Sequence, residues 1–388
     1  MAEPRSEGAE RQRVALVLSG GGARAAYQVG VLRSLARARP DLTLPIVTGV
    51  SAGAINAAFL AAHPGRFGEA VERLAELWWS LDIQRVFRVD VRSLGTNVVR
   101  WGTRLVSGGG ALAPQVRGLV DTSPLGELLA EALAAEPGGA IPGIARALDA
   151  GRLRSFTVIT SNYGTGQSVI WVAGHGVEAW ERPNRRSVAC RAITVDHVMA
   201  SSSLPVFFPA VQIDGSWHGD GGIRLITPLS PAIHLGAERI LAISTRYRRT
   251  IPEADRPAVH GYPPPLQIMG QLLNAVFLDM LDQDCLRIER LNLLLRELPE
   301  ERRHGLRLIE VGTVRPSRDL GALAGELEPR LPRGFRYLTR SLGSRETASP
   351  DLLSLLMFQP DYLRRLIEIG EADGEEKLEE MLRLVDGS

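Results

Sequence analysis

The sequence predicts an α/β protein with a helical C-terminal portion. Two apolar and partly β-branched runs, 14–19 and 44–50, each pass within a few residues into a stretch rich in helix formers. Such strand-then-helix units are typical of a sheet that is covered by helices. A further strand is predicted over 306–311, and the apolar residues beyond it have helical spacing.

Three contiguous glycines, Gly20, Gly21 and Gly22, follow the first strand, and a helical pattern begins directly after them. Successive backbone amides at such a junction point toward one spot and bind an anion. In an acyl-transfer enzyme this anion is the tetrahedral oxyanion. We therefore predict an oxyanion loop that also includes Ala23 and Arg24. Two interpretations of Arg24 stay open: it orients an anionic group, or it is an ordinary surface arginine.

The second strand ends in a G-x-S-x-G pattern around Ser51, and helix formers follow from residue 52 to residue 60. A strand that passes into a helix within two residues needs a tight bend, which the small residues of this pattern allow. The hydroxyl then projects at a helix N-terminus, where free amides favour negative charge. We predict that Ser51 is a nucleophile and that Gly49 and Gly53 shape its turn.

Asp220 is the predicted base for this serine. Gly221 and Gly222 follow it and would let another backbone approach closely. A carboxylate takes the proton of a serine if its environment raises its pKa. His218 lies two residues away, but a lone histidine in this position is more often packed in the core than involved in chemistry.

The three segments, in this order, resemble the patatin-like phospholipase family. That family carries a G-G-G-x-R/K oxyanion loop, a G-x-S-x-G serine and a D-G-G/A aspartate, and the block 199–209 also resembles it. The match covers about residues 12–245, and the C-terminal helices resemble the tail of bacterial patatin-like proteins more loosely. The resemblance implies a three-layer α/β/α fold with a central, mostly parallel sheet.

The resemblance also implies a chemistry, the hydrolysis of acyl esters of lipids. Carried over to this sequence, Ser51 and Asp220 form a Ser–Asp dyad, and the amides of Gly21, Gly22 and Ala23 form the oxyanion hole. The expected partner is a lipid ester substrate. Neither a cofactor nor a metal ion is expected.

Other functions stay open. A Ser–His–Asp hydrolase would need a histidine after the acid in chain order, and His234, His260 and His304 are available. A non-catalytic lipid-binding scaffold is a second alternative. A dinucleotide site is not favoured because the contiguous glycines lack the G-x-G-x-x-G spacing, and a Walker loop is excluded because no Gly-Lys-Ser/Thr follows them.

The expected organisation of the 388 residues is a disordered tail over 1–12, a hydrolase domain over 13–315 and a helical portion over 316–388 packed on it. Breaks are placed at 107–113 and 250–265, which are rich in Gly or Pro. One long helix is predicted over 266–298, and short helices over 350–357 and 362–369.

Several side chains outside the three motifs are expected to be structural. Asp279, Asp282 and Asp284 are expected on a solvated helix face or in ion pairs with Arg287 and Arg290, rather than as metal ligands. The pairs 78–79 and 86–87 lie where a lid would lie, but core packing is the preferred interpretation. The dipeptide 214–215, Asp-Gly, predicts a hairpin turn.

Charge and hydropathy restrict the partners and the compartment. The 45 Lys and Arg residues balance 44 Asp and Glu, so no strong field favours nucleic acid. No signal peptide is visible, and no apolar run approaches the ~18 residues that span a bilayer. Two cysteines, Cys190 and Cys285, are too few for a disulfide framework. The sequence thus predicts a cytoplasmic protein with peripheral access to membranes. A homo-oligomer is compatible with it.

Overall fold

The structure is a computed structural model. It describes residues 13–88, 118–174, 180–225, 228–255, 261–277, 280–332 and 349–387, together with 257, 259, 335, 336 and 340. The predicted tail over 1–12 and the predicted break over 107–113 lie outside these residues.

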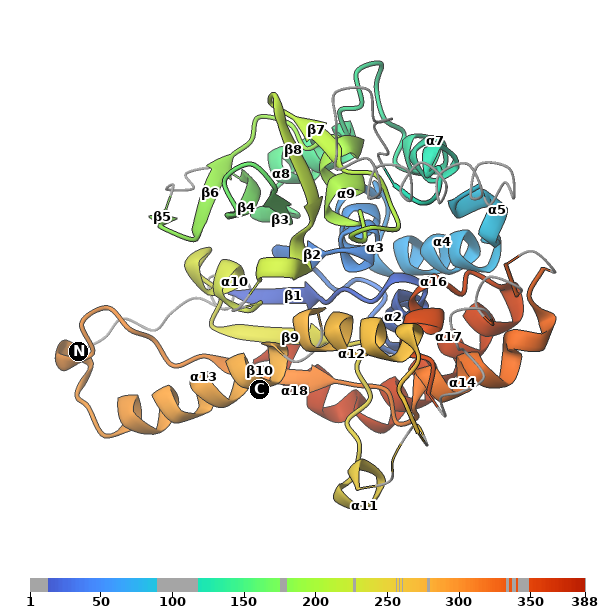
Figure 1. The fold of residues 1–388 in the computed structure, drawn as a ribbon. Coiled ribbons are helices and arrows are strands. Elements are labelled where there is room, and N and C mark those ends of the chain that lie inside the picture. Colours follow the sequence, from blue (N-terminus) through green and yellow to red (C-terminus); the bar gives the residue numbers. More distant parts are fainter. Residues whose placement is uncertain are drawn as a thin grey trace.

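A mixed β-sheet runs through the centre of the molecule (Figure 1). Within the described residues, the strand order is β10-β9-β1-β2-β3-β4-β6-β5, and β8 joins β3 with β7 at its side. The first five strands of this order run parallel, whereas β4 is antiparallel to β3. The strands are β1 (Val14–Leu18), β2 (Ile46–Val50), β3 (Ser155–Asn162), β4 (Ser168–Gly174), β5 (Glu181–Arg182), β6 (Arg185–Ala189), β7 (Val211–Ile213), β8 (Ser216–Asp220), β9 (Arg239–Ile243) and β10 (Glu310–Val314).

Helices cover both faces of this sheet. The described α-helices are α2 (Ala26–Ala38), α3 (Ala52–Ala62), α4 (Phe67–Trp79), α5 (Ile83–Val86), α7 (Ser123–Ala132), α8 (Pro142–Asp149), α9 (Val195–Ser201), α10 (Ser230–His234), α11 (Ile251–Ala254), α12 (Pro265–Phe277), α13 (Met280–Arg296), α14 (Leu320–Leu327), α16 (Asp351–Leu356), α17 (Pro360–Glu376) and α18 (Leu378–Asp386). Short 3-10 turns are η1 (Gly22–Ala25), η2 (Gly221–Arg224), η3 (Glu300–Arg302) and η4 (Glu328–Arg330).

The alternation of side chains along β1 explains why each face of the sheet has its own apolar core. Leu16 and Leu18 enter one apolar core, whereas Ala15 and Val17 enter the other, because successive residues of a strand point to opposite sides. The first core includes side chains of α2, α3, α4, α9, α16 and α17, and the second includes side chains of α10 and α13. The predicted three-layer α/β/α arrangement with a mostly parallel central sheet is confirmed.

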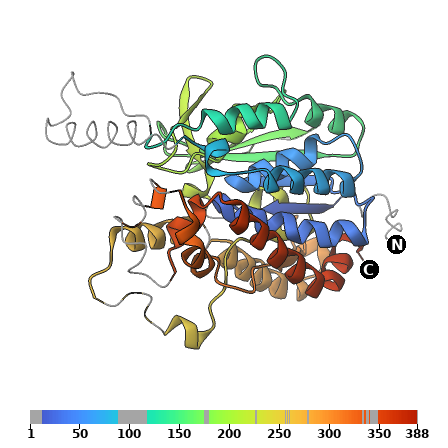
Figure 2. The ribbon, with the colours of Figure 1, turned by 90° about the vertical axis from the view of Figure 1, so that its right-hand side faces the viewer.

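The C-terminal helices are part of the first of these layers. Helix α17 packs along α2, and Figure 2 shows the red C-terminal helices beside the blue N-terminal ones. Glycines let the two helices approach closely: a Cβ on Gly30 would collide with the carbonyl oxygen of Ile367, and one on Gly370 with that of Tyr27. The sequence pattern did not indicate this pairing, because the two helices are far apart in the chain.

The long helix predicted over 266–298 is wrong. The structure has two helices there, α12 and α13, and residues 278–279 lie outside the described part. The two helices pack on different cores, since Leu273 belongs to the first core whereas Leu281 and Ile288 belong to the second. A single straight helix would not contact both.

Other predicted elements are shifted or extended. The strand expected over 306–311 begins at Glu310 instead, because the side chain of Asn292 binds both the backbone amide and the carbonyl of Ile309, at 3.1 and 2.7 Å. Helix α16 lies within the predicted 350–357, α17 is longer than the predicted 362–369, and α18 was not predicted. The hairpin turn is confirmed, with Asp214 and Gly215 at φ of 49° and 77°. Trp78 and Phe87 are buried in the core, which agrees with the preferred interpretation of core packing.

Candidate active site

The carboxyl ends of three parallel strands meet at one edge of the sheet. The glycine loop follows β1, Ser51 follows β2, and Thr245 follows β9 shortly after its end. Strand β8 pairs antiparallel with the last residues of β3, which places its final residue, Asp220, opposite Thr160. The topology therefore brings the three predicted motifs together.

Ser51 and Asp220 are in direct contact. The Ser51 Oγ donates a hydrogen bond of 2.6 Å to Oδ2 of Asp220, and the amide of Gly222 donates one of 2.9 Å to Oδ1. Both side chains are buried. Burial raises the pKa of Asp220 to about 7, although the hydrogen bonds from Ser51 and Gly222 act in the opposite direction. A carboxyl group with this pKa can accept a proton near neutral pH.

The positive φ that bends the chain after β2 belongs to Ser51 itself. Ser51 has φ of 56° and ψ of −137°, a conformation that a residue with a side chain rarely adopts. The motif glycines instead permit close packing: a Cβ on Gly49 would lie 2.6 Å from Cα of Ala54, and one on Gly53 would collide with the carbonyl oxygen of Leu18. Gly221 likewise lies against the carbonyl oxygen of Ile159, so another backbone does approach it closely.

Two serines at the C-terminal end of α9, Ser201 and Ser202, fix the backbone of Ser51. Its amide donates a hydrogen bond of 3.0 Å to Ser201 Oγ, which in turn donates to the carbonyl of Ile159 at 2.7 Å. Ser202 Oγ donates to the carbonyl of Ser51 at 3.0 Å. These two serines lie in the block that resembled the family, but the sequence assigned them no function. The run of serines beside an apolar helix is the signal that could have found them.

The glycine loop lies directly against the dyad. A Cβ on Gly20 would lie 2.8 Å from Cβ of Ser51. Gly22 has φ of 54°, in the left-handed region, and begins η1. The first amides of a helix have no acceptor within it, so those of Gly22 and Ala23 are suited to an anion. The amide of Arg24 differs, because it donates to the carbonyl of Gly21 at 3.0 Å.

Thr245 holds the other side of the loop. Its Oγ1 donates a hydrogen bond of 2.5 Å to the carbonyl of Gly20, and a Cβ on Gly21 would collide with its side chain. No sequence motif pointed to this residue. Its position directly after an apolar strand, at the same edge as the other loops, is the available signal.

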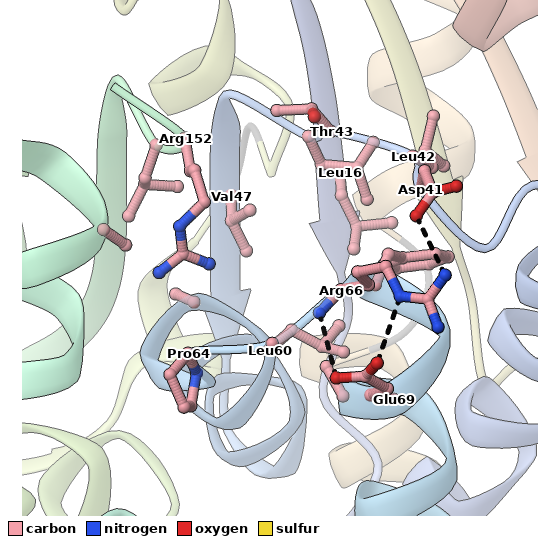
Figure 3. Close-up of a pocket in the computed structure, with 17 residues that line it drawn as sticks. Leu16, Asp41, Leu42, Thr43, Val47, Leu60, Pro64, Arg66, Glu69 and Arg152 are labelled. Carbon is pink, nitrogen blue, oxygen red and sulfur yellow. Dashed lines mark hydrogen bonds and ion pairs between the residues drawn. The ribbon is translucent and has the colours of Figure 1, made fainter. Parts of the chain in front are cut away.

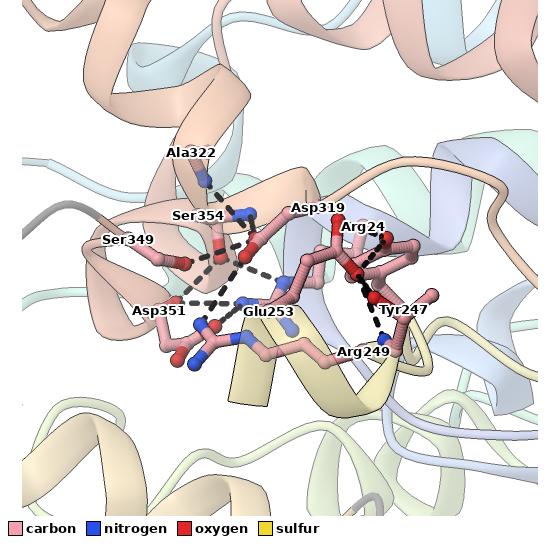
Figure 4. A network of polar contacts seen from close by, with 11 residues as sticks. Arg24, Tyr247, Arg249, Glu253, Asp319, Ala322, Ser349, Asp351 and Ser354 are labelled. Atoms are coloured by element: carbon pink, nitrogen blue, oxygen red, sulfur yellow. Dashed lines mark hydrogen bonds and ion pairs between the residues drawn. The ribbon is translucent and has the colours of Figure 1, made fainter. Parts of the chain in front are cut away.

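The side chain of Arg24 contradicts the surface interpretation. It is 3% exposed, so it is not a surface arginine, and its guanidinium contacts helix α16. The Nε donates to Ser354 Oγ at 2.6 Å and Nη2 donates to Asp351 Oδ1 at 2.6 Å (Figure 4). The anionic group that Arg24 binds in the structure is therefore a carboxylate of the protein.

A buried chain of amide side chains connects the helices that follow the two loops. Gln28 of α2 donates to the carbonyl of Ser19 at 2.8 Å and accepts from Asn56 of α3 at 3.0 Å. Asn56 in turn accepts from Nε1 of Trp78 at 2.7 Å. Because buried polar groups are costly unless they are paired, this chain fixes α2 and α3 relative to each other.

Among the described histidines, His218 and His234 have partners away from Ser51. His218 is buried, with Nδ1 2.9 Å from Thr160 Oγ1 and its ring against Trp171, and the expected packed role is confirmed. His234 stacks on Trp180 and contacts Ser230 through Nδ1. His260 lies outside the described residues.

A cavity of about 360 Å³ lies away from the dyad (Figure 3). Its lining includes Thr43 and Leu44, which precede β2, and Arg152 and Leu153, which precede β3. It therefore opens at the amino edge of the sheet, opposite to Ser51. At its mouth Arg66 binds Glu69 and Asp41 in ion pairs of 3.0 and 3.5 Å.

The expected ion pairs with Arg287 and Arg290 are wrong for Asp282 and Asp284. Asp282 binds Arg246 and Arg315 instead of the arginines of its own helix. Asp284 is buried and accepts a hydrogen bond of 2.9 Å from the amide of Leu229. Asp279 lies outside the described residues. Across the part of the chain that the structure describes, no cluster of three or more His, Cys, Asp or Glu is arranged to hold a metal ion.

Cys190 and Cys285 are free thiols, as expected. Among the described helices, none combines the length and the apolar character that a crossing of the bilayer requires.

Comparisons with known proteins identify the family that the sequence resembles. A family model described as patatin-like phospholipase matches residues 16–233. A search of the curated proteins finds none whose sequence matches this chain. Among solved structures, human GIVD cytosolic phospholipase A2 is 11% identical with a TM-score of 0.45, over 99% of this chain and 61% of that one. VipD from Legionella pneumophila is 13% identical with a TM-score of 0.37, over 92% of this chain and 67% of that one.

Proposed function

Since the chain belongs to the patatin-like phospholipase family, we propose that it hydrolyses acyl esters of lipids with Ser51 as the nucleophile and Asp220 as the general base. The observation that carries this proposal is the 2.6 Å hydrogen bond from Ser51 Oγ to a fully buried carboxyl group. Family membership supports a lipid ester as the substrate. The assignment of Ser51 and Asp220 to these roles is our proposal beyond family membership.

In the proposed mechanism, Ser51 Oγ attacks the acyl carbonyl carbon and Asp220 Oδ2 takes its proton. The carbonyl oxygen becomes an oxyanion, which the amides of Gly21, Gly22 and Ala23 stabilise. The protonated Asp220 then gives its proton to the leaving alcohol, and an acyl-serine remains. A water molecule, deprotonated by the same carboxylate, attacks the carbonyl carbon of this ester. The bond to Ser51 Oγ breaks, Asp220 returns the proton to this oxygen, and the fatty acid is released.

The contacts of the dyad favour this scheme over a Ser–His–Asp triad. In a triad the base next to the serine is an imidazole that an acid orients. Here the serine hydroxyl is bonded to the carboxylate itself, and the ring of His234 is stacked on Trp180. The raised pKa of Asp220 supplies the basicity that an imidazole would otherwise provide.

We also propose that the edge of the sheet with the dyad contacts a lipid surface. Helix α12 packs on η2, which follows Asp220, and on α16, which in turn contacts the glycine loop. Ile268, Met269 and Leu272 of this helix are exposed, Leu272 by 57%. An apolar helix face beside the site is suited to peripheral contact with a membrane, from which a lipid substrate could enter.

The test is hydrolysis by the purified protein of a panel of phospholipids, lysophospholipids, acylglycerols and acyl thioesters. We expect release of fatty acid from at least one of these classes, loss of this activity in Ser51→Ala and a loss of at least ~10³-fold in Asp220→Asn. Ser203→Ala is the matched control, because its hydroxyl contacts only the carbonyl of Met199 in the structure. Full activity of Ser51→Ala would contradict the proposal. A folded wild type that is inactive on every ester would favour the scaffold alternative.

A further inference from the structure

We propose that Asp351 and Ser354, on helix α16, are positioning residues for the oxyanion hole. This inference rests on the proposed function. Both residues lie far beyond residue 233, where the match to the family model ends. They act through Arg24, the residue that follows the predicted oxyanion amides directly in the chain.

Within the described residues, the guanidinium of Arg24 makes three hydrogen bonds, all to α16. Nη2 donates to Asp351 Oδ1 at 2.6 Å and to the carbonyl of Asp351 at 3.2 Å, and Nε donates to Ser354 Oγ at 2.6 Å. Ser354 Oγ donates in turn to the carbonyl of Asp351 at 2.5 Å. Because hydrogen bonds from a charged donor in two directions restrict both the position and the orientation of a planar group, Arg24 is fixed in place.

The backbone of the loop has a second contact with the same helix. A Cβ on Gly22 would collide with the carbonyl oxygen of Leu355, so the loop and the last turn of α16 lie backbone against backbone. Gly22 and Arg24 flank Ala23 on both sides. Two of the three predicted oxyanion amides, those of Gly22 and Ala23, therefore lie between two contacts with α16.

Helix α16 is itself firmly packed, which a positioning element requires. Every residue from Leu352 to Leu356 is buried. Phe358, just beyond its end, stacks on Trp78 at 6.4 Å between ring centroids and meets Phe87 edge-on at 6.3 Å. The position of the loop is thus set by the C-terminal part of the chain as well as by β1.

Arg24 is buried and Asp351 is largely buried, with side-chain exposures of 4% and 14%. A buried ion pair is weak evidence for stability, because the cost of removing both charges from water offsets most of their attraction. A geometric role explains the pair better. Small displacements of catalytic groups cost as much as ~10²-fold in rate, and a single oxyanion donor is worth ~10²–10³-fold.

The test uses Asp351→Asn and Ser354→Ala, with Asp319→Asn as the matched control. Asp319 belongs to the same polar network (Figure 4), where it binds Arg249 and Ser349 and caps α14 instead of binding Arg24. Each variant is assayed for kcat and KM on a short p-nitrophenyl ester, for the affinity of a trifluoromethyl ketone that mimics the tetrahedral intermediate, and for thermal stability.

We expect Asp351→Asn and Ser354→Ala to lower kcat by about tenfold or more while KM stays within about twofold. The affinity for the trifluoromethyl ketone should decrease by the same factor as kcat/KM. Asp319→Asn should lower the thermal stability about as much as Asp351→Asn does, but its kcat should stay within about twofold of the wild-type value. Equal kcat in all three variants and in the wild type would overturn the inference. An inactive wild type would instead contradict the proposed function, so the two failures are distinguishable.

A double-substitution cycle gives a second readout if Asp351→Asn does not fold. Arg24→Lys keeps the charge near Asp351 but has no Nε–H to bind Ser354. Ser354→Ala should therefore lower kcat in the wild-type background and have much less effect when Arg24→Lys is already present. Equal effects of Ser354→Ala in the two backgrounds would show that Ser354 does not act through Arg24 and would overturn the inference.

Discussion

The backbone amide of Ser51 donates a 3.0 Å hydrogen bond to the hydroxyl of Ser201, a residue 150 positions further along the chain. The same hydroxyl donates to the carbonyl of Ile159, the residue of β3 that also lies against Gly221. One side chain thus connects the turn of the nucleophile with the strand beside the aspartate. This contact fixes the unusual backbone conformation of Ser51.

Replacement of Ser201 by alanine should lower kcat by about tenfold or more, because the buried amide of Ser51 loses its acceptor and the turn loses its support. The unsatisfied amide should also lower the free energy of unfolding by about 1–3 kcal/mol. Steady-state kinetics and denaturant unfolding measure the two effects. Ser203→Ala is the control: it removes a hydroxyl from the same segment but keeps the backbone hydrogen bond that the carbonyl of Ser203 accepts from the Asp220 amide. Equal kinetics of the two variants would contradict this role of Ser201.

The rate of ester hydrolysis should depend on pH with an apparent pKa near 7. Burial raises the pKa of Asp220 to about 7, so below this pH the carboxyl group is protonated and cannot accept the proton of Ser51. Activity should therefore increase as the pH rises from 5 to 8 and then level off. A profile of kcat/KM against pH on an ester without titratable groups measures this. A rate that is already maximal at pH 5 would argue against Asp220 as the base.

Asp220→Asn should stabilise the protein at alkaline pH although it removes activity. The pKa of Asp220 is raised on folding from the ordinary ~3.9, so the folded state binds this proton more tightly than the unfolded chain does. The contribution of Asp220 to stability is therefore retained at acid pH and is lost as the pH rises toward 7. The stability gain of the variant should be largest at pH 8 and vanish near pH 4. Urea unfolding at several pH values tests this. A difference in the free energy of unfolding between the variant and the wild type that does not change with pH would contradict it.

The contact of the glycine loop with the nucleophile predicts that Gly20→Ala is inactive. The added methyl group would lie 2.8 Å from Cβ of Ser51, closer than real Cβ contacts, so the loop or the serine must move. We expect kcat to fall by at least ~10²-fold. Gly126→Ala is the control, since on helix α7 its methyl group would only meet Met199 at 3.9 Å, and it should be neutral or stabilising by up to about 1 kcal/mol. Comparable kcat in the two variants would contradict the proposed site geometry.

Metal chelation should leave activity unchanged. The proposed scheme assigns the proton acceptor to Asp220 and the oxyanion donors to backbone amides, so each step is supplied by the chain itself. Dialysis against EDTA followed by the ester assay measures this. A strong decrease that a divalent cation restores would contradict the scheme and direct attention to Asp282 and Asp284.

The sequence predicted the central part of the fold because its signals are local. The strands β1 and β2 and the helices after them follow from apolar runs that end in small residues, and the close approach of Ser51 to Asp220 followed from motifs of high specificity. The bend was assigned to the glycines of the motif, whereas the structure places the positive φ on Ser51. Local sequence does not distinguish a glycine that bends the chain from one that admits close packing.

The contacts that hold the site were not predictable in the same way. Arg24 binds residues 327 and 330 positions away, and the sequence around it gives no indication of such partners. The division of 266–298 into α12 and α13 depends on two separate cores, and the start of β10 depends on the side chain of Asn292. Each of these features is decided by tertiary contacts and not by hydrophobic periodicity.

The central claim is that Ser51 forms a covalent acyl intermediate with the help of Asp220. Intact-mass analysis and peptide mapping after incubation with a fluorophosphonate that carries an alkyl chain test it most directly. The account predicts a single adduct on the peptide that contains Ser51, formed at least ~10²-fold more slowly in Asp220→Asn and absent in Ser51→Ala. An adduct on a different residue, or equal rates of labelling with and without the Asp220 carboxylate, would contradict it.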